Sequence, residues 1–387
     1  MARVQEFYKG RKKRRSYAII PFSIVMGIIA LAVVLFYSMQ QYAVISKDDV
    51  QVVIPGVNEV ETTVDAVGNV VRVFDPVSVS VVFDEADYSS VKATAGKDVP
   101  EVRAIFVPAE NLTQDKLNEY FSRLNAGNGL ILEMKGRNGV LLWDCKADEA
   151  FKYALSTPNA QTDALPGILA EMRNQKPDIY LVAQISCCID ELFSNHSNSC
   201  TLKTNYGANF HDDLGYWLDP YNLNLRTYVE QMVRELWDMG FDEVLLADVR
   251  HPTLPTEEDE KVELVYTRDM STKPSPMNAV CGFALTVAQA LEDRPEGKYL
   301  SIYCYSRPAL VKADDSTGQD ARLFMKLYDR VYLDTDGYAY PYNVSDIESQ
   351  ITIGNKYNRL VPVVVNNLLD NSSWVLVDDL GDEEEED

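Results

Sequence analysis

Short apolar runs alternate with amphipathic stretches through most of the chain after residue 100. The runs are continuous rather than alternately polar, which is typical of strands in a parallel sheet that is buried on both faces. We predict strands at residues 102–107, 129–134, 179–185, 243–249, 299–305, 330–333 and 360–365, with residues 373–377 as a candidate eighth strand.

Between these runs, apolar residues recur with a period near 3.6, which is typical of helices packed on one face. The predicted helices are residues 113–124, 164–174, 225–239, 278–291, 319–328 and 345–353. The regular alternation of strand and helix favours a (β/α)8 TIM-type barrel over residues 101–378. A doubly wound open sheet is the alternative, but it commonly carries a glycine-rich loop after the first strand, and residues 108–111 (PAEN) do not form one.

The first hundred residues follow a different pattern. Residues 17–37 carry no charge and are long enough to cross the hydrocarbon core of a bilayer. Basic residues cluster in residues 1–16, so the positive-inside rule predicts a cytoplasmic N-terminus and an exported remainder. We predict an uncleaved transmembrane signal anchor, with a cleaved signal peptide as the alternative, because the apolar run exceeds a usual signal-peptide core.

Two further segments lie outside the predicted barrel. Residues 38–100 are rich in Val, Asp and Ser, which predicts an extracytoplasmic linker with short β segments or a hairpin that packs on the barrel. The alternative is a stalk that only spaces the barrel from the membrane. Residues 379–387 are nearly all acidic, which predicts a solvated, disordered tail.

Charge and cysteine usage exclude several function classes. The net charge of −23 argues against binding to nucleic acid or to other polyanions. The six cysteines form no C-x-x-C pair and the chain has three histidines, so we predict no metal and no cofactor. A disulfide from Cys200 to Cys187 or Cys188 is one expectation outside the cell; the other is that the cysteines are small buried hydrophobes.

Polar and aromatic residues follow the predicted strands, at the end where active sites of parallel barrels lie. They are Glu133, Lys135, Asp190, Asp248, Arg250, His251, Tyr305, Asp334, Asp336, Asn366 and Asn367, with Trp217, Asp219 and Tyr221 from the long third strand-to-helix connection. Carboxylates, amides and aromatic rings in one place are typical of carbohydrate recognition, because rings stack on sugar C–H surfaces while polar groups bind hydroxyls.

One stretch carries a family resemblance. Residues 217–221 read WLDPY and residues 240–252 read GFDEVLLADVRHP, with a predicted helix between them. The stretch resembles a bacterial glycoside-hydrolase-like barrel family with the pattern W-x-D-P-Y, a helix, then G-F-D-E-I-x-F-D-Y-I-R-F-P. Residues 128–135 (NGLILEMK) also resemble its N-A-V-V-I-D-V-K. The resemblance covers about residues 101–378 and implies a barrel of the alpha-amylase type that acts on polysaccharide.

The sequence departs from that pattern at polar positions. Ala247 stands at the family's strand-four Asp and Asp248 at its Tyr, while Gln184, Ile189 and His251 replace an Arg, a Lys and a Phe. Adjacent strand residues point to opposite faces, so Asp248 replaces the missing carboxylate only through a bulge or a register slip. These changes favour a membrane-anchored bacterial barrel that binds cell-envelope polysaccharide outside the cell.

Two alternative functions remain. One is an active glycosidase on cell-wall or capsular glycan, because Glu133, Asp248 and Asp336 are candidates for the two carboxyl groups that hydrolysis needs. Asp248 would then be nucleophile or base, Glu133 the acid, and Arg250 the group that keeps Asp248 ionised; Arg250 bracing the loop against Asp219 or Glu243 is the structural alternative. The other is a scaffold that binds an envelope protein. The predicted substrate contacts are Trp217, Asp219, Tyr221, Lys135, Asp190, Arg250, His251 and Asn366.

Overall fold

The computed structural model describes residues 99–124, 128–157, 159–197, 199–254, 262–266, 275–305, 309, 313–334, 359–365 and 373–377, with four short strands before residue 75. The chain divides into two compact units, Met1–Asp75 and Pro76–Asp387. In the first unit, β1 (Ala43–Ile45) pairs antiparallel with β2 (Val50–Val52), and β3 (Thr62–Val64) pairs with β4 (Val70–Arg72).

The predicted membrane segment at residues 17–37, the predicted helix at 345–353 and the acidic tail lie outside the described residues. Among the helices that are described, none combines the length and the apolar composition needed to cross a bilayer.

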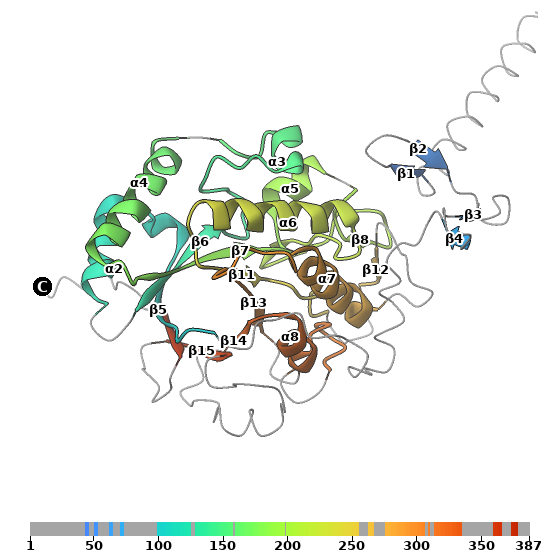
Figure 1. Ribbon diagram of the computed structural model, residues 1–387. Helices are drawn as coiled ribbons and strands as arrows, with labels where there is room; N and C mark the ends of the chain where they lie inside the picture. Colours follow the sequence, from blue (N-terminus) through green and yellow to red (C-terminus); the bar gives the residue numbers. More distant parts are fainter. Residues whose placement is uncertain are drawn as a thin grey trace, which may run out of the picture. The chain divides into compact units, whose positions relative to one another are not determined.

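Eight parallel strands close into a barrel in the second unit (Figure 1). In order around the barrel they are β5 (Arg103–Val107), β6 (Gly129–Lys135), β7 (Tyr180–Ser186), β11 (Glu243–Ala247), β13 (Tyr299–Cys304), β14 (Arg330–Asp334), β15 (Leu360–Val365) and β16 (Trp374–Val377). The pairing of β16 with β5 closes the ring, which confirms the predicted barrel and the eighth strand, and excludes the open sheet.

Helices lie outside the ring of strands (Figure 1). They are α2 (Gln114–Ser122), α3 (Asp148–Tyr153), α4 (Ala160–Gln175), α5 (Glu191–His196), α6 (Leu223–Asp238), α7 (Pro276–Ala290) and α8 (Ala321–Leu327), with a 3₁₀ turn, η2 (Ala109–Asn111). Capping residues in the sequence set their starts: Asn159 and Thr162 form a capping box on α4, and Ser275 caps α7 ahead of a proline at its first turn.

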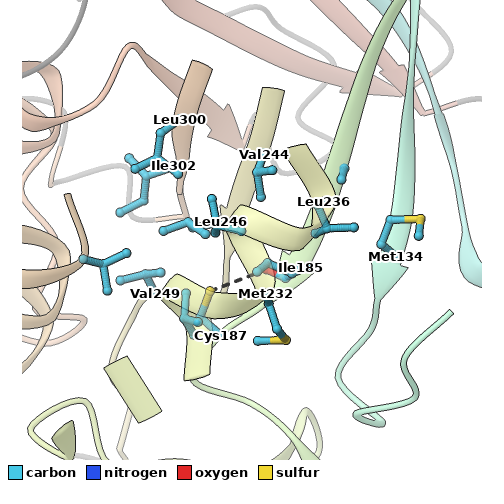
Figure 2. Packing of buried hydrophobic residues seen from close by; sticks show 14 of the residues in the cluster. Met134, Ile185, Cys187, Met232, Leu236, Val244, Leu246, Val249, Leu300 and Ile302 are labelled. Atoms are coloured by element: carbon cyan, nitrogen blue, oxygen red, sulfur yellow. Dashed lines mark hydrogen bonds between the residues drawn. The ribbon is translucent and has the colours of Figure 1, made fainter. Parts of the chain in front are cut away.

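The apolar residues form two main layers. Alternate strand residues such as Ile131, Val182 and Leu245 fill the barrel interior. The residues between them, such as Val244 and Leu246, pack outward against the helices (Figure 2). Because both faces of each strand are buried, the strands read as continuous apolar runs in the sequence.

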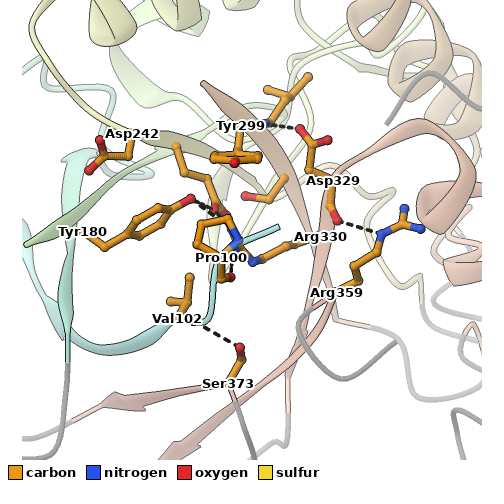
Figure 3. Close-up of polar contacts among 12 residues, drawn as sticks. Pro100, Val102, Tyr180, Asp242, Tyr299, Asp329, Arg330, Arg359 and Ser373 are labelled. Carbon is orange, nitrogen blue, oxygen red and sulfur yellow. Dashed lines mark hydrogen bonds and ion pairs between the residues drawn. The ribbon is translucent and has the colours of Figure 1, made fainter. Parts of the chain in front are cut away.

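A buried ion pair lies inside the barrel near the N-terminal ends of the strands. The guanidinium of Arg330 pairs with the carboxylate of Glu243, and both side chains are fully buried. Tyr180 and Tyr332 donate their hydroxyls to the two oxygens of Glu243 at 2.7 and 2.8 Å. Arg330 also donates to the carbonyl of Pro100 (Figure 3). The segment that leads into β5 is therefore hydrogen-bonded to the buried ion pair.

All six cysteines are buried and free, so the predicted disulfide is not formed and the buried alternative holds. Hydrogen bonds occupy the thiols instead: Cys187 lies 3.6 Å from the carbonyl of Ile185, and Cys200 lies 3.5 Å from the amide oxygen of Asn222. These thiols therefore fill the core as small hydrophobes.

The connection between β7 and α6 forms a small extension of its own. Its strands are β8 (Lys203–Thr204), which pairs with β12 (Leu264–Val265), and β9 (His211–Asp212), which pairs with β10 (Gly215–Tyr216). Ile189, Leu202, Phe210 and Trp217 form its buried apolar cluster. The extension places Trp217 close to the strand ends that carry the candidate site.

Candidate functional site

Asp248 points into the mouth of the barrel because its backbone is left-handed. The register of β11 with β7 runs unbroken from Glu243 to Ala247, so no bulge redirects the chain. Strand alternation would place Asp248 on the helix side. Its φ is +52°, however, and its carboxylate meets Ser186, an interior position of β7. Val249 correspondingly joins the outer core cluster. A positive φ in a non-glycine residue stores strain and often marks a functional site.

Four donors surround the Asp248 carboxylate. Oδ1 accepts from Nη2 of Arg137 at 2.9 Å and from Nη2 of Arg250 at 3.3 Å. Oδ2 accepts from Nε of Arg137 at 3.0 Å and from the Ser186 hydroxyl at 2.9 Å. The peptide N–H of Asp248 donates to the Tyr305 hydroxyl at 3.1 Å. The residue is only 2% exposed.

These contacts favour the ionised form of Asp248. Burial by itself would raise the pKa of Asp248, but the hydrogen bonds and charge of Arg137, aided by Arg250 and Ser186, lower it below the usual value. Arg137 donates to both oxygens and Arg250 to Oδ1, while the single proton of the Ser186 hydroxyl is shared between Oδ2 and the Ile189 carbonyl, 2.8 Å away. A nucleophile or base needs an unoccupied lone pair aimed at its target. The geometry makes Asp248 an anchor for two arginines at the mouth.

The conformation of Asp248 gives a test that is independent of ligand. Asp248→Gly and Asp248→Ala lose the same carboxylate, but only alanine keeps a Cβ in the left-handed conformation. We expect Asp248→Gly to be more stable than Asp248→Ala by about 1 kcal/mol in chemical denaturation. At position 247, one residue earlier in the strand, glycine should instead be less stable than alanine, and Ala247→Gly should lower the free energy of unfolding by about 0.5–1 kcal/mol. Equal stabilities of the two Asp248 variants would contradict the left-handed assignment.

Glu133 lies near the end of β6, on an interior position of the strand. A bulge between Glu133 and Lys135 shifts the pairing with β7 at this point. Its Oε2 accepts from the peptide N–H of Ala109 at 3.1 Å. Burial raises the pKa of Glu133 above its usual value, and the negative charges of Glu110 and Asp248 raise it further. The hydrogen bond from Ala109 and the positive charge of Arg137 lower the pKa but do not cancel the rise. Glu133 therefore takes up a proton more readily than an exposed glutamate.

Lys135 and Asp190 form a buried ion pair. Lys135 Nζ lies 2.8 Å from Oδ2 of Asp190 and donates to the carbonyl of Ser186 at 2.6 Å, and both side chains are about 1% exposed. Asp190 Oδ1 also caps α5 by accepting from the Phe193 N–H at 2.7 Å. Gly139 permits this arrangement, because a Cβ there would lie 2.0 Å from the same oxygen. Both residues were predicted as substrate contacts; the structure brings them together as an ion pair, with both side chains buried.

The W-x-D-P-Y loop is buried against the site. Asp219 accepts from the Tyr221 N–H at 2.9 Å and so shapes the turn before α6. The Arg250 guanidinium lies 5.8 Å from the Trp217 ring centroid and 4.0 Å from that of Tyr305. Arg250 pairs with Asp248, the partner expected under the glycosidase alternative. Glu243, one of the two partners named in the structural alternative, pairs with Arg330.

His251 is buried beside this loop. Its Nδ1 lies 3.0 Å from the Pro252 carbonyl, and burial lowers the pKa of His251 to about 4. The other two predicted site residues, Asp336 and Asn366, lie outside the described residues. In the part of the chain that the structure describes, no group of three or more His, Cys, Asp or Glu side chains is placed to hold a metal ion.

Three contributors to the site were not among the predicted site residues. Arg137 follows the second strand by two residues, but its partner Asp248 is 111 residues away, so nothing local identifies it. Ser186 ends the third strand as a small polar residue. Tyr303 stacks on Tyr305 with ring centroids 4.3 Å apart, which forms an aromatic surface beside Arg250. A basic residue just after a barrel strand is the signal that would have indicated Arg137.

Comparison with known protein families gives one match. The family model described as "Putative glycosyl hydrolase domain" matches residues 104–343, more than half of the chain. A search of the curated proteins found no match.

Similar solved structures include a hypothetical protein from Ruminiclostridium thermocellum ATCC 27405, with 18% identity and a TM-score of 0.42 over 51% of this chain and 96% of that one. The Bacillus cereus spore cortex-lytic enzyme SleL has 11% identity and a TM-score of 0.37 over 68% of this chain and 50% of that one. Alpha-L-fucosidase isoenzyme 2 from Paenibacillus thiaminolyticus has 12% identity and a TM-score of 0.46 over 69% of this chain and 40% of that one. The chain thus spans half or less of the last two proteins. By this match over residues 104–343, the chain belongs to the family described as "Putative glycosyl hydrolase domain".

Proposed function

We propose that the barrel mouth binds a polysaccharide of the cell envelope and does not cleave it. The observation that carries the proposal is the state of Asp248, whose two oxygens are occupied by Arg137, Arg250 and Ser186 and whose side chain is buried. Retaining and inverting hydrolysis both require a second carboxylate that is free to attack or to activate water. Asp248 does not offer one.

The remaining groups at the mouth suit carbohydrate. Tyr303 and Tyr305 are half-buried and stacked, and aromatic faces pack on the C–H surfaces of sugar rings. Glu133 is half-buried, and no described cation forms a salt bridge with it, so it supplies a group that both donates and accepts when protonated. The family match supports a glycan as the ligand class.

The location of the protein is part of the same proposal. Residues 17–37 are apolar and follow a basic N-terminus, which supports a single membrane span with the barrel on the outer face. A barrel held there would lie within reach of cell-wall and capsular polymers.

An active glycosidase is the second candidate function. The raised pKa of Glu133 favours it, because a general acid in glycoside hydrolysis needs its proton at neutral pH. This candidate requires a partner carboxylate other than Asp248. It differs from the first candidate in that the bound glycan is cleaved.

Binding can be tested with the full-length chain in detergent on an array of bacterial cell-wall and capsular glycans. We expect retention of a glycan by the wild type and about tenfold weaker binding by Glu133→Ala, since a hydrogen bond to a sugar hydroxyl contributes about 1–1.5 kcal/mol. Glu171→Ala, at an exposed position of α4, is the matched control and should bind as the wild type does. A wild-type protein that retains no carbohydrate would overturn the proposal.

A further inference from the structure

Among the residues that the structure describes, buried polar atoms on three neighbouring side chains beside the mouth have no hydrogen-bond partner. They are Nε1 of Trp217, Nε of Arg250 and Nε2 of His251. Trp217 is 1% exposed and His251 is 4% exposed, so solvent does not satisfy these atoms. A buried polar atom without a partner costs free energy, and native proteins keep few of them without a reason. Three such atoms on neighbouring residues need a shared explanation.

The chemistry of the three atoms is mixed. The indole N–H of Trp217 and the Nε–H of Arg250 only donate. In His251, Nδ1 faces the carbonyl of Pro252, which only accepts, so the proton lies on Nδ1. Because burial lowers the pKa of His251 to about 4, the ring is neutral at pH 7 and Nε2 is an acceptor. The group that satisfies the set has to accept and to donate.

The residues that carry these atoms lie next to one another. The Arg250 guanidinium lies 5.8 Å from the Trp217 ring, and His251 is the next residue in the chain. The His251 ring lies 6.1 Å from that of Tyr266, which in turn packs edge-on against Tyr221 at 4.9 Å. Tyr221 belongs to the same loop as Trp217. Tyr266 is half-buried, whereas Trp217, Tyr221 and His251 are buried, so Tyr266 lies between these side chains and the solvent.

We propose that Trp217, Arg250 and His251 form a subsite for a hydroxyl group of the bound glycan, which enters when Tyr266 moves. This inference rests on the proposed function. A hydroxyl accepts from the indole or guanidinium N–H and donates to Nε2 of His251. A carboxylate or phosphate has no proton to donate and would place its negative charge against that lone pair. The subsite therefore selects a neutral, hydroxyl-bearing sugar.

The proposal is tested by a pair of substitutions that remove an unsatisfied atom and keep a ring. His251→Phe and Trp217→Phe should each weaken binding of the glycan retained by the wild type about tenfold, the effect of about one lost hydrogen bond. Trp217→Phe should also lower the thermal unfolding temperature less than Trp143→Phe does, because both changes remove the same ring volume but only the Trp143 indole N–H loses a hydrogen-bond partner. Trp143→Phe is the matched control: its indole N–H already donates to Glu235 at 2.8 Å, so this variant should lower the unfolding temperature and leave affinity unchanged.

The outcomes separate the two proposals. If the wild type binds a glycan and both variants bind it equally well, the subsite is wrong and an enclosed water molecule satisfies the three atoms. If the wild type binds no glycan, the proposed function fails and the subsite fails with it. A fall in unfolding temperature for Trp217→Phe as large as that for Trp143→Phe would also contradict the assignment of an unsatisfied indole N–H.

Discussion

Replacing Arg330 by methionine is expected to lower the free energy of unfolding by about 3–5 kcal/mol, the usual cost of removing one partner from a buried ion pair. The variant leaves the Glu243 carboxylate inside the barrel without its cation. Burial raises the pKa of the hydroxyls of Tyr180 and Tyr332, so they stay protonated and continue to donate, but they carry no charge to balance it. Urea denaturation at pH 7 measures the loss.

Two comparisons make this prediction specific. Arg234→Met removes an arginine that pairs with Glu230 and Asp293 at the surface, and it should cost no more than about 1 kcal/mol. The double variant Arg330→Met with Glu243→Gln should recover part of the loss, because it removes the uncompensated charge. A cost for Arg330→Met as small as that for Arg234→Met would show that the interior pair is not formed.

Acidification from pH 7.5 to pH 4 is expected to destabilise the wild type by about 3 kcal/mol more than it destabilises His251→Phe. The pKa of His251 is about 4 in the folded protein, below the ordinary value of 6.5. Above pH 6.5 both states are neutral and the residue has no effect. Between pH 6.5 and pH 4 the unfolded chain binds a proton that the folded chain does not, so stability is lost as the pH falls.

The comparison with His251→Phe cancels the titration of the carboxylates. Asp248, whose pKa is lowered in the folded state, loses its contribution as the pH falls from about 4 downward, outside most of this window. Denaturation midpoints at intervals of half a pH unit measure the difference. If the free energies of unfolding of the wild type and His251→Phe differ by the same amount from pH 7.5 to pH 4, His251 is not buried as a neutral ring.

The strands of the barrel could be predicted because each is buried on both faces and reads as an apolar run. The prediction for residues 360–365 matches β15, and residues 299–305 match β13 to within one residue. The helices α3 and α5 could not be predicted, because each has six residues and is too short to show a helical period.

The candidate site was predicted only in part. Strand-end position brought Glu133, Asp248 and Arg250 together, and all three lie at the mouth. The direction of Asp248 could not be predicted, since alternation fails where a single residue becomes left-handed. The partnership of Asp248 with Arg137 depends on the closure of the barrel and not on any local pattern.

Whether the barrel cleaves the polysaccharide that it binds can be measured by the release of new reducing ends. The full-length wild type and the Glu133→Gln variant are incubated with the same polymer, and reducing ends are counted over time. We expect no release by the wild type above that of Glu133→Gln, because Asp248 is held by two arginines and a serine. Sustained release by the wild type that is lost in Glu133→Gln would contradict it and establish an active glycosidase.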